Sequence, residues 1–417
     1  MTDSTVDLTS PPLVHIDPLG ADRHGESARM RELGPVVRAE LPGGVRMWVI
    51  TDYALLAELA ADPRVGRDWR NWDALERGEI PGDWPLLSMI RLNNAMARDG
   101  AEHRRLRRPL TRSFTRTRVE RMRPRIDQIV TTMLDALPGQ VGPDGTVDLR
   151  LNYAYPFPMQ VICELIGVPE EWWPRFRELI DTVVRADTTA EQFLATQQER
   201  HELWQRLFAM RRAEPADDLT SALLADDDED GALTDDEMED TLWMLIGAGH
   251  ETSISLITNA TRALLTHPDQ LALVRDGDSE TWSKVVEETL RWDAPVGNFP
   301  ARFPVEDITV AGVTIPKGDG ILAPWSGVNR DPAQYGEDAD RFDINRPVKK
   351  HMAFGGGPHV CIGPALARFE AMAALPPLFA RYPDLRLAVD PAELSAVPSI
   401  FSNSVSSLPV HLGPAKG

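Results

Sequence analysis

The stretch FGGGPHVCIG, from Phe354 to Gly363, sets three consecutive glycines a few residues before a single cysteine, Cys361. Glycines adopt backbone angles and allow close approaches that residues with a Cβ resist, so a flat group can lie directly against this loop. The run IGPALARFEAMAALPPLF that follows predicts a helix with Pro364 in its first turn. Cys361 would then lie at the positive end of a helix dipole, where a thiolate is favoured over a thiol.

A thiolate on such a turn suits haem iron as a proximal ligand, because its electron release assists O–O cleavage. The pattern Phe354, Gly357, His359, Cys361 and Gly363 resembles the haem-binding signature of the cytochrome P450 superfamily. The resemblance implies haem b as the cofactor and Cys361 as the ligand of its iron. It also implies haem contacts from Phe354, Gly355, Ala248 and His359. A buried cysteine without any ligand is the alternative.

Length and composition are those of a large acidic enzyme. The 417 residues contain no linker or repeat, so we expect one unit, residues 1–417. A net charge of −20 argues against nucleic acid as a partner, because neutralising phosphates needs clustered Lys and Arg. The two cysteines, Cys163 and Cys361, are far apart in the sequence and predict no disulfide. No signal peptide or membrane span is predicted, so we expect a cytoplasmic protein. We also expect a monomer.

The segment AEHRRLRRPL places His103 and Arg107 on one face of a helix, four residues apart. It resembles the superfamily's H-x-x-x-R helix, which implies that both side chains bind the haem propionates. The resemblance implies the same role for Arg302 and His359. Ten arginines between Arg104 and Arg125 form the one strongly basic patch. Such a patch is either a solvated face or a surface that steers an acidic ferredoxin to the haem.

The run DTLWMLIGAGHETSISLITNATRALLTH is apolar almost all round, which predicts a buried helix. Ala248 and Gly249 remove bulk, and the Thr252 hydroxyl can bond to the carbonyl of residue 248, so we expect a local kink. The sequence AGHET resembles the superfamily's A-G-x-[DE]-T, which implies that Glu251 and Thr252 are catalytic. Dioxygen reduction at a buried haem needs a proton relay from water, and these two residues would supply it.

Glu288 and Arg291 lie three residues apart and resemble the superfamily's E-x-x-R. Arg341 fits the third member of that structural ion network, although Ala339 and Asp340 stand where the family often has Pro-Glu. The network would hold the loop that leads to Cys361.

The resemblance implies a mainly α-helical fold with a smaller β region, the cytochrome P450 helical prism, with haem between the Thr252 helix and the Cys361 helix. A hairpin is predicted over residues 36–50 around Gly43-Gly44 and a second over 308–318. Two helices are predicted over 170–212, and the resemblance implies that this pair is the mobile lid of the pocket. Core packing is the alternative for each candidate pocket residue. The candidate pocket residues are Trp84, Leu86, Leu87, Met89, Ile90, Met244, Leu245, Val296, Phe299, Ile400 and Phe401.

Two metal sites compete with this interpretation. Asp226, Asp228, Asp230, Gly231 and Glu237 match the spacing of a calcium-binding EF-hand loop. Thr234 and Glu237 also form a helix capping box, which explains the glutamate without calcium. Zinc held by the histidines at 351 and 359 with the cysteine at 361 lacks a fourth ligand.

Three functions remain open at this stage. The first is a monooxygenase that inserts one oxygen atom of O2 into a C–H bond of a bulky hydrophobic natural product, such as a macrolactone, or of a steroid. The resemblance implies that a ferredoxin and its NAD(P)H-dependent reductase supply the electrons. The second is oxidative coupling or peroxygenase chemistry on the same haem, which retention of Glu251 and Thr252 disfavours. The third is a haem-based ligand binder without catalysis.

Overall fold

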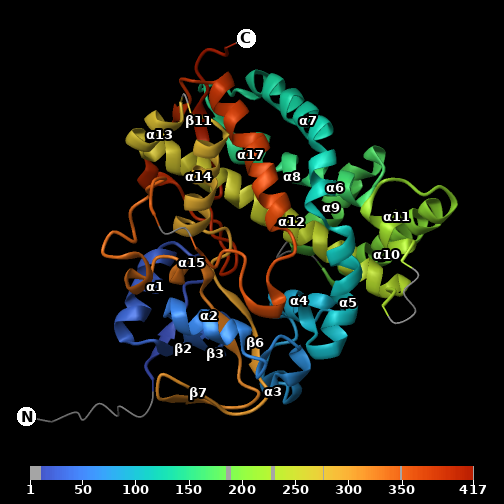
Figure 1. Ribbon diagram of the computed structural model, residues 1–417, viewed down its shortest axis with the longest axis vertical. Coiled ribbons are helices and arrows are strands. Elements are labelled where there is room, and N and C mark those ends of the chain that lie inside the picture. The colour runs from blue at the N-terminus through green and yellow to red at the C-terminus, as the bar shows by residue number, and fades with distance from the viewer. Residues whose placement is uncertain (1–10, 185–188, 227–230, 276, 348–349, 417) are drawn as a thin grey trace, which may run out of the picture.

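The computed structural model describes residues 11–184, 189–226, 231–275, 277–347 and 350–416. Helices fill most of the molecule, and the main group of strands lies at the end nearer the N-terminus (Figure 1). This is the mainly helical architecture with a smaller β region that the sequence predicts.

In chain order the helices are α1 (Arg23–Leu33), α2 (Tyr53–Ala61), α3 (Asp73–Glu76), α4 (Leu87–Ile90), α5 (Gly100–Ser113), α6 (Arg116–Arg121), α7 (Arg123–Ala136), α8 (Pro156–Ile166), α9 (Trp173–Val184), α10 (Ala190–Ala213), α11 (Leu219–Leu224), α12 (Asp235–Thr266), α13 (Pro268–Val274), α14 (Ser279–Trp292), α15 (Trp325–Val328), α16 (Pro332–Tyr335) and α17 (Pro364–Arg381). Most of the long helices lie in the middle and upper parts of Figure 1, whereas α1, α2, α3 and α4 lie in the lower half near the strands.

The strands form three groups. The largest is a mixed sheet in the order β1-β2-β3-β9-β6-β4, followed by β10-β11-β5 and the hairpin β7-β8. Their bounds are β1 (Leu13–His15), β2 (Val36–Leu41), β3 (Val45–Ile50), β4 (Val65–Gly66), β5 (Val147–Asp148), β6 (Phe299–Pro304), β7 (Ile308–Val310), β8 (Val313–Ile315), β9 (Ile321–Ala323), β10 (Arg386–Leu387) and β11 (Pro409–His411).

Both predicted hairpins are confirmed. β2 and β3 pair antiparallel from Val36↔Ile50 to Leu41↔Val45, and the turn between them uses Gly43 and Gly44 at φ of 84° and 74°. These left-handed angles favour glycine. β7 and β8 form the second hairpin, with Val310 opposite Val313.

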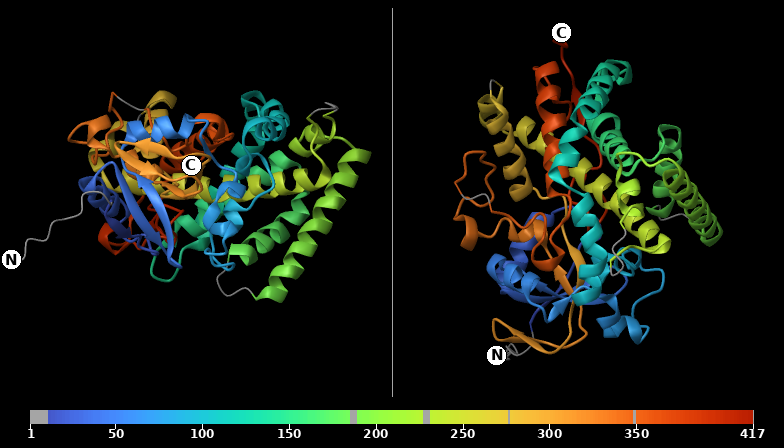
Figure 2. Two further views of the ribbon diagram at one scale, coloured as in Figure 1. Left: turned by 90° about the horizontal axis from the view of Figure 1, so that it is seen from below. Right: turned by 45° about the vertical axis from the view of Figure 1, so that its right-hand side comes forward.

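Helix α12 crosses the centre of the molecule, and the views of Figures 1 and 2 agree on this. It has 32 residues, a length of about 48 Å at 1.5 Å per residue. Its first turn is fixed by the capping box in which the Thr234 hydroxyl accepts from the Glu237 amide and the Glu237 carboxylate accepts from the Thr234 amide. The helix runs unbroken through Ala248 to Thr252, and the back-bond expected there is present at 2.6 Å.

The main hydrophobic core surrounds α12 and includes Cys163, which is fully buried on α8. Burial raises the pKa of the Cys163 thiol to about 12, so this cysteine is an inert packing residue. Among the described residues no helix is long and apolar enough to cross a membrane.

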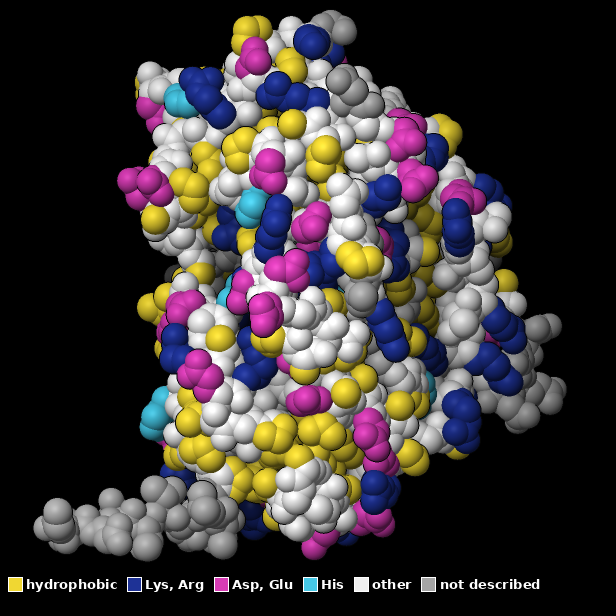
Figure 3. All heavy atoms as spheres, turned by 60° about the vertical axis from the view of Figure 1, so that its left-hand side comes forward, with side chains coloured by type: hydrophobic (Ala, Val, Ile, Leu, Met, Phe, Trp, Pro, Cys, Tyr) yellow, Lys and Arg dark blue, Asp and Glu magenta, His cyan; other side chains and the backbone are white. Residues whose placement is uncertain are grey.

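Acidic and basic side chains are interspersed over the face drawn in Figure 3. Many of the ten arginines between Arg104 and Arg125 form ion pairs with neighbouring carboxylates. The ion pairs include Arg105 with Glu237, Arg121 with Asp217 and Arg125 with Glu170. The patch therefore has a weaker field than its arginine count suggests.

Candidate functional site

The loop before α17 presents the Cys361 thiol. Gly355 and Gly357 adopt φ of 70° and 69°, and the Cys361 amide donates to the Phe354 carbonyl at 2.9 Å. A Cβ at Gly357 would lie 1.9 Å from the Ala60 carbonyl oxygen, so only glycine lets the end of α2 pack here. The close approach at Gly357 is to the backbone of α2, and the contact of a flat group with this loop stays a prediction.

The Cys361 thiol is not poised as a thiolate by the protein alone. The residue is exposed beside its loop, yet nearby protein atoms desolvate the sulfur and raise the pKa of the thiol. The Gly363 amide, which donates to Sγ at 3.3 Å, and the cations Arg107 and Arg368 lower that pKa by less. The predicted preference for thiolate is therefore wrong for the metal-free protein, because burial outweighs the helix terminus; a bound metal would itself displace the proton.

Four side chains predicted to bind carboxylates, two arginines and two histidines, come together beside this loop. The rings of His103 and His359 lie 4.3 Å apart, and Arg302 is buried with them. Arg107 donates to the Val360 carbonyl at 2.6 Å, which ties α5 to the Cys361 turn. His359 Nε2 lies 2.9 Å from the carboxylate of Asp99.

This cluster has too few anions of its own. His103 Nε2 and His359 Nδ1 are buried and have no hydrogen-bond partner among the described residues. Burial and the neighbouring His359 and Arg107 lower the pKa of His103 to about 4, and burial lowers that of Arg302 to about 10. The arginines need a counter-charge and the buried histidine nitrogens need hydrogen-bond partners, so the cluster fits a cofactor that brings two carboxylates, such as haem.

On the opposite helix, α12, Glu251 is clamped by residues that sequence reasoning missed. Its Oε1 accepts from Ser402 Oγ at 2.7 Å and from Arg150 Nη2 at 3.1 Å. Ser255 Oγ lies 3.5 Å from the same oxygen. About a third of the Glu251 side chain remains exposed, 34%. One carboxylate oxygen is thus fixed, which sets the orientation of the other.

A second acid, also missed, joins α12 to α17. Glu370 is buried, and its carboxylate group accepts from the hydroxyl of Ser253, next to Thr252. Burial raises the pKa of Glu370 to about 8, so its carboxyl group is mostly protonated at neutral pH. The link places a neutral acid between the two helices that flank the candidate site.

The buried ion network contains Glu288 and Arg291 as predicted, but its other arginine is Arg346. Arg291 pairs with Glu288 at 2.7 Å and 2.9 Å, with both side chains fully buried. Arg346 Nε lies 3.5 Å from Glu288, whereas the Arg341 residue is exposed and contributes only its carbonyl. The prediction of Arg341 is therefore wrong: the turn at 338–346 directs Arg346 inward, where Asp338 also pairs with it at 2.9 Å.

The candidate pocket residues separate into two groups. Trp84, Leu87, Ile90 and Ile400 are buried in the core beside the main sheet, and Trp84 Nε1 donates to the Pro42 carbonyl at 2.9 Å. Trp84 is therefore a core residue, which was the alternative to a place in the pocket. The remaining candidates, except the buried Leu245, are partly accessible. These are Leu86, Met89, Met244, Val296, Phe299 and Phe401.

Neither competing metal site gains support. Two of the predicted calcium ligands, Asp228 and Asp230, lie outside the described residues. Asp226 and Glu237 are paired with Arg112 and Arg105. Within the described ranges, no three His, Cys, Asp or Glu side chains are grouped so that they could hold a metal ion.

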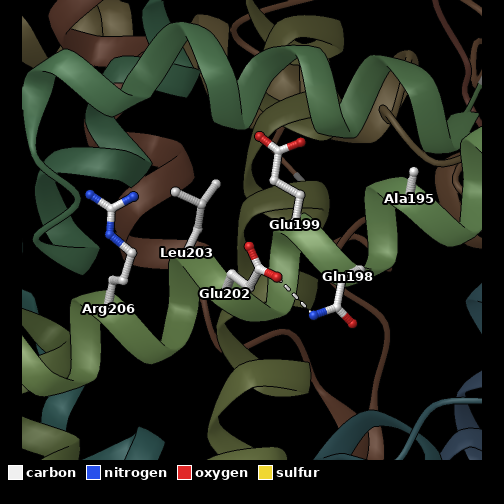
Figure 4. Close-up of a pocket in the computed structure, with 6 residues that line it drawn as sticks. All are labelled: Ala195, Gln198, Glu199, Glu202, Leu203 and Arg206. Atoms are coloured by element: carbon white, nitrogen blue, oxygen red, sulfur yellow. Dashed lines mark hydrogen bonds between the residues drawn. The ribbon is translucent and has the colours of Figure 1, made fainter.

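A separate groove of about 490 Å³ lies along α10 (Figure 4). Its lining belongs to one helix and is largely polar, and Gln198 donates to Glu202 there at 2.8 Å. None of the predicted site residues lines it.

Comparisons with known proteins find relatives about 40% identical to this chain over nearly its whole length. Residues 281–404 match the family model described as Cytochrome P450. The chain is 41% identical to 2-hydroxy-5-methyl-1-naphthoate 7-hydroxylase of Streptomyces carzinostaticus over 405 residues, 95% of this chain and 97% of the relative. It is 40% identical to vitamin D(3) 25-hydroxylase of Pseudonocardia autotrophica over 393 residues, 94% of each. Testosterone-bound CYP154C4 from Streptomyces sp. matches with a TM-score of 0.90 and 41% identity, covering 97% of this chain and 99% of that one.

Proposed function

Because this chain belongs to the cytochrome P450 family and is a P450 monooxygenase with a haem cofactor, we propose that it inserts one oxygen atom of O2 into a C–H bond of a bulky hydrophobic natural product or steroid. The observation that carries the proposal is the Cys361 thiol, presented on a glycine turn beside buried Arg302 and the buried, unpartnered ring nitrogens of His103 and His359.

The proposed cofactor form is haem b. Cys361 would bind its iron, and His103, Arg107, Arg302 and His359 would bind its carboxylates. When bound, haem supplies the redox centre at which O2 is reduced and cleaved. Packing against it would come from Phe354, Gly355 and Ala248.

The proposed proton path uses two residues of α12. Thr252 would hold a water molecule by its hydroxyl, once that hydroxyl exchanges its bond to the Ala248 carbonyl. Glu251 would carry protons inward through the carboxylate oxygen that Ser402 and Arg150 leave free.

The substrate class rests on what the relatives' names say of those proteins. One hydroxylates an aromatic acid, one hydroxylates vitamin D(3), and one binds testosterone. Phe299 and Phe401, whose rings lie 5.8 Å apart, would form part of an apolar wall for a similar molecule here.

The proposed electron source is a ferredoxin with an NAD(P)H-dependent reductase, docked near the arginines of α5 and α6. A monomeric state and a cytoplasmic location stay predictions, as does the assignment of residues 1–417 to one domain.

The test uses the holoprotein with ferredoxin, its reductase and NADPH under ¹⁸O2. The panel is testosterone, vitamin D3, 2-hydroxy-5-methyl-1-naphthoate and 6-deoxyerythronolide B. A product containing one ¹⁸O atom supports the proposal. A coupled product without ¹⁸O would favour oxidative coupling, product formed only with added hydrogen peroxide would favour a peroxygenase, and no product from any compound would favour a ligand binder.

A further inference from the structure

The pairing of β4 with β6 brings a further arginine to the cationic cluster. The register runs Val65↔Pro304 and Gly66↔Phe303, and its continuation would set Arg67, one residue past the end of β4, opposite Arg302. Residues directly opposite in an antiparallel pair project to the same face, and like charges there repel. Arg302 is buried and Arg67 is half-buried with its Nε shielded from solvent, so the two positive charges are best accommodated with an anion close by.

Arg67 is held firmly at this position. Its backbone amide donates to both carboxylate oxygens of Asp99, at 2.8 Å and 3.1 Å. Its guanidinium lies over the ring of Phe299, 4.6 Å from the centroid. The backbone and the stem of the side chain are thus ordered before any ligand arrives, which lowers the entropy cost of binding.

The Arg67 guanidinium lacks a carboxylate partner among the described residues, and its Nε is buried without a hydrogen bond. Asp99 is the one nearby acid that interacts with it, but the oxygens of Asp99 already accept from two backbone amides and contact His359. Burial, together with repulsion from Arg302 and Arg107, lowers the pKa of Arg67 to about 9. Burial raises the free-energy cost of keeping the Arg67 guanidinium charged, and a nearby carboxylate would lower that cost.

We propose that Arg67 binds a carboxylate of the haem together with Arg302, as a further cofactor-binding residue. The inference rests on the proposed function. The guanidinium also lies over Phe299 of the proposed apolar wall, but the haem is favoured over a carboxylate of the substrate because the polar neighbours of Arg67 contact the Cys361 turn. Arg107 contacts the carbonyl of Val360, and His359 shares Asp99 with the Arg67 amide.

The test compares holoproteins carrying Arg67→Met, Arg67→Lys and, as a matched control, Arg64→Gln on the exposed surface of the same segment. Two properties are measured: the rate at which haem transfers to excess apomyoglobin, and the ferric/ferrous midpoint potential. A charge-assisted hydrogen bond contributes about 1.5–3 kcal/mol, so Arg67→Met should speed haem loss at least about tenfold. The midpoint potential should become more negative, because a nearby cation favours the reduced haem.

Arg67→Lys keeps the charge but loses the planar fork, so it should lose haem several-fold faster than wild type and more slowly than Arg67→Met. Arg64→Gln should match wild type. Should Arg67→Met fail to fold, the lysine variant decides alone, and a wild-type rate of haem loss would overturn the proposal.

Substrate titrations separate the two sources of carboxylate. In one outcome, Arg67→Met has the haem-loss rate and midpoint potential of wild type and binds testosterone equally well, but binds 2-hydroxy-5-methyl-1-naphthoate more weakly. Arg67 would then bind a carboxylate of the substrate, and the proposal would be wrong. Unchanged behaviour in every assay would also overturn it. Failure of the proposed function looks different, because the wild-type protein itself would then not retain haem.

Discussion

The buried acid Glu370 gives a prediction whose sign can be worked out from the structure. Its pKa is raised from 4.5 to about 8 by burial, so the carboxyl group is neutral in the folded protein and ionised in the unfolded chain between those pH values. The unfolded chain then binds fewer protons than the folded protein. The stability contributed by Glu370 is therefore complete below pH 4.5 and is lost as the pH rises to about 8.

The magnitude follows from the size of the shift. At about 1.4 kcal/mol per pH unit, ionisation of the unfolded chain lowers the free energy of unfolding by at most about 5 kcal/mol above pH 8. Glu370→Gln removes the titrating group and keeps a partner for the Ser253 hydroxyl, so its stability should not decline over this range. At pH 8 the free energy of unfolding of the variant should be at least that of wild type and up to several kcal/mol higher, and the difference should shrink towards pH 5.

The assay is urea unfolding of the holoprotein, followed by circular dichroism at several pH values between 5 and 8.5. Glu171→Gln, on the surface, is the matched control and should follow wild type. Difference infrared spectra should also show a protonated carboxyl band in wild type that is absent from Glu370→Gln. An identical pH dependence of wild type and Glu370→Gln would refute the reasoning.

Three further predictions concern the relay and the ion network. Ser402→Ala removes the shorter of the two hydrogen bonds, from Ser402 and Arg150, that fix one oxygen of Glu251, so more peroxide per NAD(P)H should form. The substrate dissociation constant, read from the haem absorption shift, should stay unchanged, and unaltered coupling would remove the positioning role of Ser402. Thr252→Ala should likewise divert electrons to peroxide, with Thr252→Ser restoring most of the coupling, and equal coupling in all three proteins would contradict the relay. Arg346→Met should lower the free energy of unfolding by roughly 3 kcal/mol, whereas Arg341→Met should change it by less than about 0.5 kcal/mol. Urea unfolding of both variants checks this. A larger loss in Arg341→Met than in Arg346→Met would make Arg341 the third member of the ion network.

Local patterns in the sequence predicted the elements that short segments determine. The turn glycines, Pro364 at the start of α17 and the back-bond of Thr252 each depend on a few neighbouring residues, and the structure has them as predicted. The pair Glu288–Arg291 is local in the same sense, being one turn of a helix.

Contacts between distant segments could not be predicted. Ser402 and Arg150 reach Glu251 across 151 and 101 residues, and Glu370 reaches Ser253 across 117, with no spacing that signals the pairing. Arg346 replaced Arg341 because an irregular segment has no period to fix which arginine turns inward. The thiol at Cys361 was misjudged for a related reason, since desolvation depends on surroundings assembled from the whole fold.

The central claim is that the Cys361 thiolate binds the haem iron, and the carbon monoxide difference spectrum of the reduced protein tests it most directly. We expect the spectrum of a thiolate-ligated haem in wild type and its loss in Cys361→His. A spectrum of nitrogen-ligated haem in carefully prepared wild type, or one that Cys361→His leaves unchanged, would contradict the claim.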